Sequence, residues 1–453
     1  MSNVKLLILC LLLLAAPALA QPQPATDDQD LVIEEVFESL GEAVDPGEQY
    51  QHVLTFWCSP YPLEQGWAVQ VTRRWNHLHP DQAVRLVGIP PDRLAEDVLR
   101  EAIKKGETPD LSNHLFPSNV AEFAPALRRL DDFPKLMSHL ADRSGQGAAA
   151  PFRSPDGGLY QLPWKGNPIL LQYNTAMFRR YGVEPPRTYS DLLKAARELQ
   201  AREQVFMLAP DPADKFWRRY YDFYPLFLAA SGGQSLLKAD GSANFDNAAG
   251  VAVMTFLKEL YASGAAPRQE LYPDASDELV AFTSDKLATL LTGPWNIELT
   301  RDIGGEAEQF DFGPVPVPDD YPVDQPVYSY GNFRNFGIFK SCQNPELAAE
   351  FILFATSHES DLDLLRTTHE LPFRQGLESD PQFVTALQLE PAHLSKFALQ
   401  ARWLKPVDNV PYFNEVLKAL SKEVVACAVE GKKTPEQAIH DAALATNGLS
   451  SKR

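Results

Sequence analysis

An alternation of strand and helix patterns after residue 50 is the feature that most limits the folds open to this chain. Residues 52–57 form an apolar run with the length of a buried strand, and residues 83–89 form a second one. Between them lies a helix pattern whose apolar face carries Trp67, Val71, Trp75 and Leu78, and a further helix pattern runs to Lys105. The order β-α-β-α predicts an α/β fold with a mainly parallel sheet covered by helices.

Helix start signals continue this pattern to the C-terminus. Thr188 and Asp191 have the spacing of a capping box, in which the Thr hydroxyl accepts an early backbone N–H. Asp246 precedes a helix pattern with one apolar face, and we expect it to be the N-cap. Proline at the first helical position predicts two further starts, at residues 344–345 and 434–435.

The length of the chain indicates how many domains it has, and its charge argues against one class of partner. Its 453 residues suggest two or three domains, at roughly 100–200 residues each. The 60 acidic and 41 basic side chains give a formal net charge of -19. Nucleic-acid-binding proteins usually carry a basic patch, whereas the basic residues here are scattered as pairs such as Arg128-Arg129. The composition therefore argues against a nucleic-acid partner.

The first twenty residues have the three parts of a secretory signal peptide. Lys5 gives a positive start, Leu6 to Ala15 is an apolar run, and Ala18-Leu19-Ala20 fits the small-x-small cleavage rule. The run is too short to span a membrane, which takes about 20 apolar residues. We expect cleavage after Ala20, an N-terminal leader over residues 21–49 and a periplasmic location.

Three cysteines follow this segment, namely Cys58, Cys342 and Cys427. An odd number leaves at least one thiol unpaired within a monomer. A Cys58–Cys342 disulfide would suit an oxidising compartment, but the sequence alone does not place the two side chains together. Small buried thiols are the favoured alternative.

The sequence carries none of the common catalytic or metal-binding signatures. It has no GxSxG nucleophile elbow, no GxxxxGK[ST] phosphate loop and no GxGxxG motif. His77 and His79 are two residues apart, and side chains at that spacing point to different faces of a helix. We therefore expect a protein that is not an enzyme and that uses no metal or cofactor.

Aromatic residues beside turns are the candidates for ligand contact. Trp295 follows Gly293-Pro294 at the end of an apolar strand pattern, and open α/β sheets bind ligands at strand ends. Trp57, Trp164 and Tyr221 also lie next to turns or strand ends. A place in the core is the competing interpretation for each of them, but the Gly-Pro turn favours an exposed Trp295.

Five segments, taken in order, carry a family resemblance over nearly the whole mature chain. They are GETPD (106–110), GLYQLP with QYN (158–163 and 172–174), GVEPPRTY (182–189), LTGPW (291–295) and NPELAAEF (344–351). LPFR at 371–374 also matches. Together they resemble the ABC-transporter extracellular solute-binding proteins of family 1, the maltose-binding type.

The resemblance implies a type II periplasmic-binding-protein fold. Two α/β lobes, each a mostly parallel sheet flanked by helices, would be joined by three hinge crossings, with the ligand enclosed between them. The crossings would lie at residues 161–166, 328–335 and 371–372. The first lobe would comprise residues 50–162 and 331–370, and the second residues 163–330 and 371–453.

The same resemblance implies a set of ligand-binding residues. Trp295 and Tyr221 match aromatic positions that stack on a sugar ring. Asn113-His114 stand in a ligand-facing loop where the maltose-binding relatives have an aromatic residue, which argues against a long maltodextrin. We expect polar contacts to the ligand from Glu64, Asn113, Asn332 and Arg374, and aromatic contacts from Trp57 and Trp164 as well.

The function implied is that of the substrate-binding component of an ABC importer. A monomer would capture a sugar, oligosaccharide or polyol and deliver it to an inner-membrane permease. The same fold could instead carry glycerol phosphate or a polyamine, and Lys165 with Arg374 is the basic set near a crossing that would suit a phosphate. A secreted carbohydrate-acting enzyme would need two carboxylates about 5–9.5 Å apart across a cleft. A ligand-sensing partner of a membrane receptor kinase is a further alternative.

Overall fold

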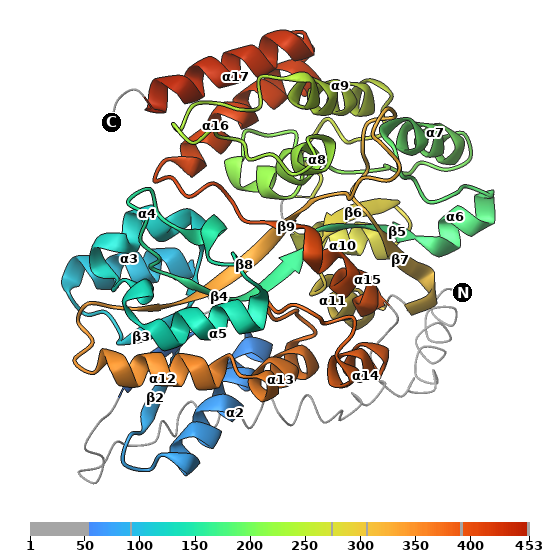
Figure 1. Cartoon of the computed structure of the whole chain (residues 1–453). Helices are drawn as coiled ribbons and strands as arrows, with labels where there is room; N and C mark the ends of the chain where they lie inside the picture. The colour runs from blue at the N-terminus through green and yellow to red at the C-terminus, as the bar shows by residue number, and fades with distance from the viewer. Residues whose placement is uncertain (1–53, 91–92, 273–274, 305–306, 390–392, 451–453) are drawn as a thin grey trace, which may run out of the picture.

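Two sheets lie at the centre of the chain, and helices surround both of them (Figure 1). The computed structural model describes residues 54–90, 93–272, 275–304, 307–389 and 393–450. The predicted signal peptide and the leader over residues 21–49 lie outside the described residues. In the part of the chain that the model describes, no helix is both long and apolar enough to cross a membrane.

The first sheet contains six strands in the order β2-β1-β3-β8-β4, with β9 beside β8. Strands β2, β1 and β3 are parallel to one another, whereas β8 runs antiparallel to both β3 and β4. The strand bounds are β1 Leu54–Cys58, β2 Val84–Gly88, β3 Leu111–Leu115, β4 Leu162–Pro168, β8 Ser329–Ile338 and β9 Leu404–Lys405. The β-α-β-α order expected over residues 52–105 is confirmed, with each predicted strand within two residues of its observed bounds.

The second sheet corrects one expectation. Its three strands follow the order β6-β5-β7, and β5 is antiparallel to both neighbours. The bounds are β5 Leu170–Asn174, β6 Thr289–Thr292 and β7 Phe310–Gly313. The expected mostly parallel sheet is therefore wrong for this half, because β5 enters from the first sheet in the direction opposite to its partners. Parallel pairing remains only in isolated bridges such as Phe206 with Leu287.

Helices pack around three main hydrophobic cores. The first core lies beneath the first sheet, and its helices are α2 Pro62–Leu78, α5 Pro134–Ser144, α12 Pro345–Ala355 and α13 His358–Thr368. Helices α3 Ala95–Lys105 and α4 Val120–Phe123 cover a satellite cluster on that sheet. The largest core involves α6 Thr175–Tyr181, α7 Tyr189–Gln200, α8 Phe223–Ala230, α9 Ala248–Ala262, α16 Phe413–Val424 and α17 Pro435–Ser450. The third core, around β6 and β7, involves α10 Ala275–Thr283, α11 Asn296–Asp302, α14 Pro381–Leu389 and α15 His393–Gln400.

The helix caps explain where several of these helices begin. Thr188 and Asp191 form the predicted capping box at the start of α7, and the side chain of Asn344 caps α12. The cap of α9 is Asn247, which accepts the backbone N–H of Gly250. The expectation for Asp246 is wrong by one residue, because the Asp246 carboxylate lies 3.0 Å from a ring nitrogen of His440 and does not cap the helix.

The three cysteines of the described chain are buried and free. Cys58 and Cys342 belong to the same hydrophobic core, and Cys427 lies in another. Burial raises the pKa of Cys342 to about 12 and that of Cys58 still further. The free-thiol alternative is therefore the one that the structure adopts, and these thiols serve as small apolar side chains.

Trp164 lies in the core rather than in a binding position. Its indole is fully buried, with a ring centroid 4.4 Å from that of Trp67, and its N–H donates to the backbone oxygen of Asn113 at 2.9 Å. Both the apolar surface and the polar atom of this side chain are therefore satisfied inside the protein. This burial overturns the expectation that Trp164 contacts a ligand.

We predict that Trp164→Ala lowers the free energy of unfolding by about 3–5 kcal/mol, because it leaves a large cavity beside Trp67. Urea unfolding followed by circular dichroism measures the change. The matched control is Trp217→Ala, since Trp217 is 42% exposed, and its removal should cost less than about 1 kcal/mol. Equal stability of the two variants would contradict the core assignment.

The pKa of Glu278 on α10 is raised by burial more than its ion pair lowers it. Arg218 bonds this carboxylate, which lowers its pKa, but burial together with the nearby carboxylates of Asp222 and Asp211 raises the pKa to about 7. A carboxyl group whose pKa is raised on folding binds its proton more tightly in the folded state. Its favourable contribution is therefore present at low pH and is lost as the pH rises from about 4.5 through 7.

We predict that Glu278→Gln removes this pH dependence. Between about pH 5 and pH 8, the stability of the wild type should fall relative to that of the variant by about 2–3 kcal/mol. Urea unfolding at four pH values in this range provides the measurement. Parallel stability curves for the two proteins would show that Glu278 does not titrate in this window.

Candidate ligand-binding site

The two sheets meet where β4 and β8 lie side by side. These strands pair from Leu162 opposite Phe336 to Pro168 opposite Gly331, and Figure 1 shows them running together through the middle of the molecule. The chain then passes to β5 of the second sheet, with the N–H of Ile169 bonded to the oxygen of Tyr330 at 3.1 Å. Side chains on this stretch can therefore reach groups of both halves.

A third segment joins this strand pair. Residues 370–373 run beside β4, where the oxygen of Leu371 accepts the N–H of Gly166 at 3.0 Å and the N–H of Phe373 bonds the oxygen of Trp164 at 2.8 Å. The side chain of Asn167 also accepts the N–H of Leu371 at 3.0 Å. All three segments predicted as crossings thus lie together in the structure.

Lys165 on β4 is the centre of a buried set of charges. Its ammonium group donates to Glu64 of α2 at 2.5 Å and to Glu370 of the third segment. The side chains of Lys165 and Glu64 are each 3% exposed. Burial raises the pKa of Glu64 above its ordinary value, although the charge of Lys165 acts in the opposite direction.

β3 contributes two further buried polar residues, Asn113 and His114. His114 lies with its Nδ1 4.0 Å from a Glu64 oxygen, and its ring contacts those of Tyr61 and Phe116 edge-on at 5.9 and 5.2 Å. Burial, together with the charges of Arg334 and Lys165, holds the pKa of His114 well below its ordinary value, so its ring is neutral. Asn113, the neighbouring residue, is fully buried.

Arg334 on β8 completes this group. Its guanidinium lies over the ring of Phe116 at 3.6 Å, and its Nη1 donates to Asn332 at 2.7 Å. Burial lowers the pKa of Arg334, but Tyr61, Glu64 and other neighbouring groups raise it, and the net shift is upward. We call the following residues the polar cluster: Glu64, Asn113, His114, Lys165, Asn332, Arg334 and Glu370.

Tyr221 and Trp295 form an aromatic pair on the other side of the site. Their rings meet edge-on, with centroids 6.4 Å apart and planes at 86°. Both are partly exposed, and the indole of Trp295 lies so close to Gly293 that a Cβ there would touch it. Burial raises the pKa of Tyr221, and Arg334 and Tyr61 also act on it, so the pair is within electrostatic reach of the polar cluster.

The polar cluster contains several buried atoms that have no hydrogen-bond partner among the described residues. They are one carboxylate oxygen of Glu64, both amide atoms of Asn113, Nδ1 of His114 and Nε of Arg334. More than about 90% of buried polar groups in proteins are paired, so such a concentration needs a reason. Donors and acceptors of this kind suit the hydroxyl groups of a solute, and an aromatic pair suits its apolar face.

The structure therefore sorts the residues expected from the sequence. Glu64, Asn113 and Asn332 lie in the polar cluster, and Tyr221 and Trp295 lie in the aromatic pair. Trp57 packs against the satellite cluster beneath α3, and Trp164 lies in the core. Arg374 contacts Asp361 at 3.3 Å and the ring of Phe383, so the structure gives it no contact with the other expected residues.

Arg334, Tyr61 and Phe116 are site residues that sequence reasoning missed. A signal for Arg334 was present, because Tyr330, Asn332 and Arg334 alternate along one strand and therefore share one face. That alternation fell within the stretch matched to the second crossing. Nothing in the local sequence indicates that Phe116 lies under the guanidinium, since the contact joins residues more than 200 positions apart.

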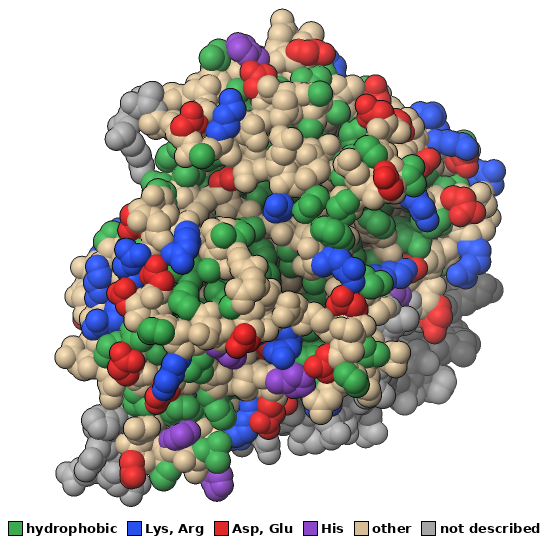
Figure 2. Space-filling model, viewed as in Figure 1, with side chains coloured by type: hydrophobic (Ala, Val, Ile, Leu, Met, Phe, Trp, Pro, Cys, Tyr) green, Lys and Arg blue, Asp and Glu red, His purple; other side chains and the backbone are tan. Residues whose placement is uncertain are grey.

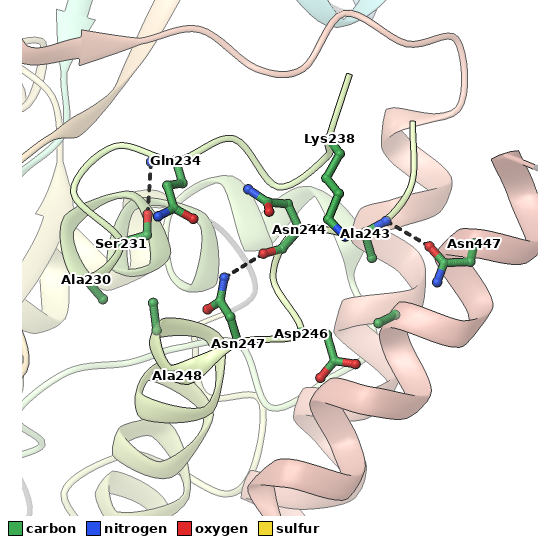
Figure 3. A pocket seen from close by; sticks show the side chains of 12 residues that line it. Ala230, Ser231, Gln234, Lys238, Ala243, Asn244, Asp246, Asn247, Ala248 and Asn447 are labelled. Carbon is green, nitrogen blue, oxygen red and sulfur yellow. Dashed lines mark hydrogen bonds between the residues drawn. The ribbon is translucent and has the colours of Figure 1, made fainter. Parts of the chain in front are cut away.

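A pocket of about 670 Å³ lies apart from this site (Figure 3). It is formed near the ends of α8, α9 and α17, and its polar lining includes Lys238, Asn244, Asn247 and Asn447. The amides are largely used within the protein, since Asn247 donates to the oxygen of Asn244 and Asn447 accepts the N–H of Ala243. Its size alone does not make it the better candidate.

The face of the molecule seen in Figure 2 shows no large patch of only acidic or only basic side chains. Acidic and basic side chains are interspersed on it, and hydrophobic side chains gather across its middle. Within the described residues, no group of three His, Cys, Asp or Glu side chains could hold a metal ion. His79 stacks on Trp75 at 4.0 Å, and His77 is exposed.

Two known proteins are similar in sequence to part of this chain. The galactooligosaccharide-binding protein of Bacillus subtilis (strain 168) is 24% identical over 300 residues, which cover 65% of this chain and 66% of that protein. The melibiose/raffinose/stachyose-binding protein MelE of the same organism is 22% identical over 274 residues, which cover 58% of this chain and 61% of that protein. The chain thus spans just under two thirds of the length of these relatives.

A solved structure shows the same fold over most of the chain. The cyclic alpha-maltosyl-1,6-maltose binding protein from Arthrobacter globiformis superposes with a TM-score of 0.76 at 18% identity, covering 88% of this chain and 99% of that one. The fold is therefore the two-lobe, type II periplasmic-binding-protein fold. The model of the family described as bacterial extracellular solute-binding protein matches residues 78–391. This chain belongs to the bacterial extracellular solute-binding protein family.

Proposed function

We propose that this protein is the substrate-binding component of an ABC importer. It captures a carbohydrate between its two lobes and delivers it to an inner-membrane permease. The observation that carries the proposal is the polar cluster with its unpaired buried atoms beside the aromatic pair. The names of the two relatives, both oligosaccharide-binding proteins, support a carbohydrate as the solute.

A sugar suits both sides of this site. Its C–H face can lie against Trp295 or Tyr221, and covering roughly 40–60 Å² of apolar surface contributes about 1–1.5 kcal/mol per ring. Its hydroxyl groups can pair with Asn113, Glu64 and Arg334. Each such bond adds about 1–3 kcal/mol of discrimination, because its loss leaves a buried group unpaired. Hydrogen bonds rather than stacking therefore select the solute.

Asn113 and His114 stand where an aromatic residue would extend the stacking surface. Since His114 is buried and neutral, this part of the site offers hydrogen bonds in place of a second aromatic platform. We therefore propose a short carbohydrate rather than a long maltodextrin.

We further propose that the lobes comprise residues 50–162 with 331–370, and 163–330 with 371–453. The three crossing segments lie side by side, which would permit a hinge motion and restrain twisting. A solute that touches both lobes would favour the closed state by its differential affinity for it. Residues 1–20 are proposed to direct export and to be removed after Ala20, leaving a periplasmic monomer.

Binding without turnover is favoured over carbohydrate hydrolysis by one contact. Glu64 and Glu370 are two carboxylates of the site, and both bond the ammonium group of Lys165. A glycosidase needs one carboxyl group to protonate the leaving oxygen and the other to attack or to activate water. A shared lysine occupies both groups. A polyamine is disfavoured as well, because Lys165 and Arg334 would repel it.

The proposal is tested with purified mature protein and a panel of solutes. We would use thermal shift and calorimetry with maltose, lactose, melibiose, raffinose, glycerol phosphate and spermidine, and chromatography to recover each solute. A carbohydrate should raise the melting temperature and be recovered unchanged. At 100-fold saturation, binding should stabilise the protein by about 2.7 kcal/mol. Binding of spermidine alone, or recovery of hydrolysed sugar, would overturn the proposal.

We predict that Trp295→Ala weakens binding of the tightest carbohydrate of this panel by at least about 1 kcal/mol, or about fivefold in Kd. The loss follows from removing the indole face, and calorimetry measures it. Trp217→Ala, which removes an exposed indole elsewhere, should leave Kd unchanged. Wild-type affinity in Trp295→Ala would mean that the aromatic pair is not part of the site.

A further inference from the structure

Arg334 differs from the other buried arginines of the described chain. Four arginine side chains are buried there, namely Arg143, Arg218, Arg219 and Arg334. Arg143 pairs with Asp361, Arg218 with Asp211 and Glu278, and Arg219 with Asp222. Arg334 has no carboxylate within ion-pair distance among the described residues, although it is only 7% exposed. A buried charge without a partner is strongly unfavourable, so its retention calls for a function.

The unpaired edge of Arg334 is the one that arginine uses to bind a carboxylate. Arg143 holds Asp361 through its Nε and Nη2, each at 2.7 Å from one carboxylate oxygen. Arg334 donates only from Nη1, to Asn332 at 2.7 Å and to the oxygen of Phe333 at 3.0 Å. Its Nε is buried and has no partner, and its Nη2 makes no hydrogen bond to the described residues. The same bidentate edge therefore has no partner among the described residues, and the contact with Asn332 holds the other side of the guanidinium.

No neighbouring carboxylate bonds Arg334 among the described residues. Lys165 stands directly opposite it in the antiparallel pairing of β4 and β8, and two cations facing each other across a strand pair repel. The charge of Lys165 is matched by Glu64 and Glu370, which both bond its ammonium group. Phe116 offers its ring face at 3.6 Å, an attraction weaker than that of a full counter-ion. The two carboxylates balance the two cations in number, but both bond Lys165, so the guanidinium of Arg334 has no direct counter-ion among the described residues.

We propose that the solute is an acidic carbohydrate whose single carboxylate binds the Nε and Nη2 edge of Arg334. This inference rests on the proposed function and refines its substrate class. A single guanidinium without a bonded carboxylate suits the single negative charge of a uronate or aldonate better than a phosphate dianion, and its planar shape fits a carboxylate in two parallel hydrogen bonds. The hydroxyl groups of the same sugar pair with Asn113 and Glu64.

The test uses matched neutral and acidic sugars. Calorimetry at pH 7 and 0.15 M salt would compare galactose with galacturonate and lactose with lactobionate, and would include glucose 6-phosphate. In the wild type, the better acidic sugar should bind at least about 30-fold more tightly than its neutral partner, as expected for a buried charge pair. Arg334→Gln should abolish this preference, and Arg334→Lys should retain only part of it, because lysine cannot form the bidentate pair. Arg73→Gln, which removes an exposed positive charge, should leave the preference unchanged.

Each alternative gives a different result. Equal or tighter binding of the neutral sugars, tighter binding of the phosphate, or a preference that survives in Arg334→Gln would overturn the inference and leave the proposed function standing. No binding of any carbohydrate, neutral or acidic, would instead count against the proposed function itself.

Thermal unfolding of the unliganded protein separates a ligand-binding arginine from a structural one. Arg143→Gln should lower the melting temperature, because it leaves Asp361 buried and unpaired. Arg334→Gln should lower the melting temperature clearly less than Arg143→Gln does, since it removes the contacts with Phe116 and Asn332 but leaves no carboxylate without a partner. A decrease as large as that of Arg143→Gln would assign Arg334 to the scaffold and overturn the inference.

Discussion

The pairing of β4 with β8 is the constraint on which the rest of the structure depends. These strands are far apart in sequence, and their register places Lys165 opposite Arg334. This pair lies close to where the chain passes from the first sheet to the second. Backbone hydrogen bonds hold both strands on every side, with β3 beyond β8 and residues 370–373 along β4. The two cations cannot move apart without breaking this ladder. Their compensation therefore has to come from side chains brought to them, or from a solute.

The two positive charges have different partners, and this difference determines what the cluster can bind. Lys165 has a carboxylate from α2 and another from the third segment, whereas Arg334 has an amide, a backbone oxygen and an aromatic ring. Away from water, hydrogen bonds and ion pairs are stronger, and a buried polar group without a partner costs more free energy. The difference in partners between Lys165 and Arg334 is therefore large in energy. The other buried arginines of the described chain each pair with a carboxylate. Arg334 differs from them because it does not.

The aromatic side of the site depends on a different constraint, which is close packing around a glycine. Gly293 has no Cβ, so the indole of Trp295 can lie directly against the backbone at the end of β6. Tyr221 meets that indole edge-on and approaches from the segment before α8. Two segments around the second sheet thus bring these two rings together. Aromatic faces of this kind suit the C–H face of a sugar ring, as the proposed function requires.

Local pattern was sufficient for much of the fold. Alternating apolar runs located β1, α2, β2 and α3, and cap residues located the starts of α7 and α12, because these features depend on neighbours within a few residues. The antiparallel second sheet could not be read in this way, since the direction of β5 depends on how the chain leaves the first sheet. The cap at Asn247 was missed by one residue for a smaller reason: Asp and Asn are both good caps, and only a distant contact with His440 decides between them.

What the sequence by itself determined about this protein is the α/β class, the family resemblance and the polar and aromatic residues available for binding. Tertiary structure alone decided which of them share a site. It buried Trp164 against Trp67, drew Arg374 to Asp361, and left Arg334 without a carboxylate beside Phe116. Burial and pairing are properties of contacts between residues far apart in the chain, so residue type and spacing do not encode them locally.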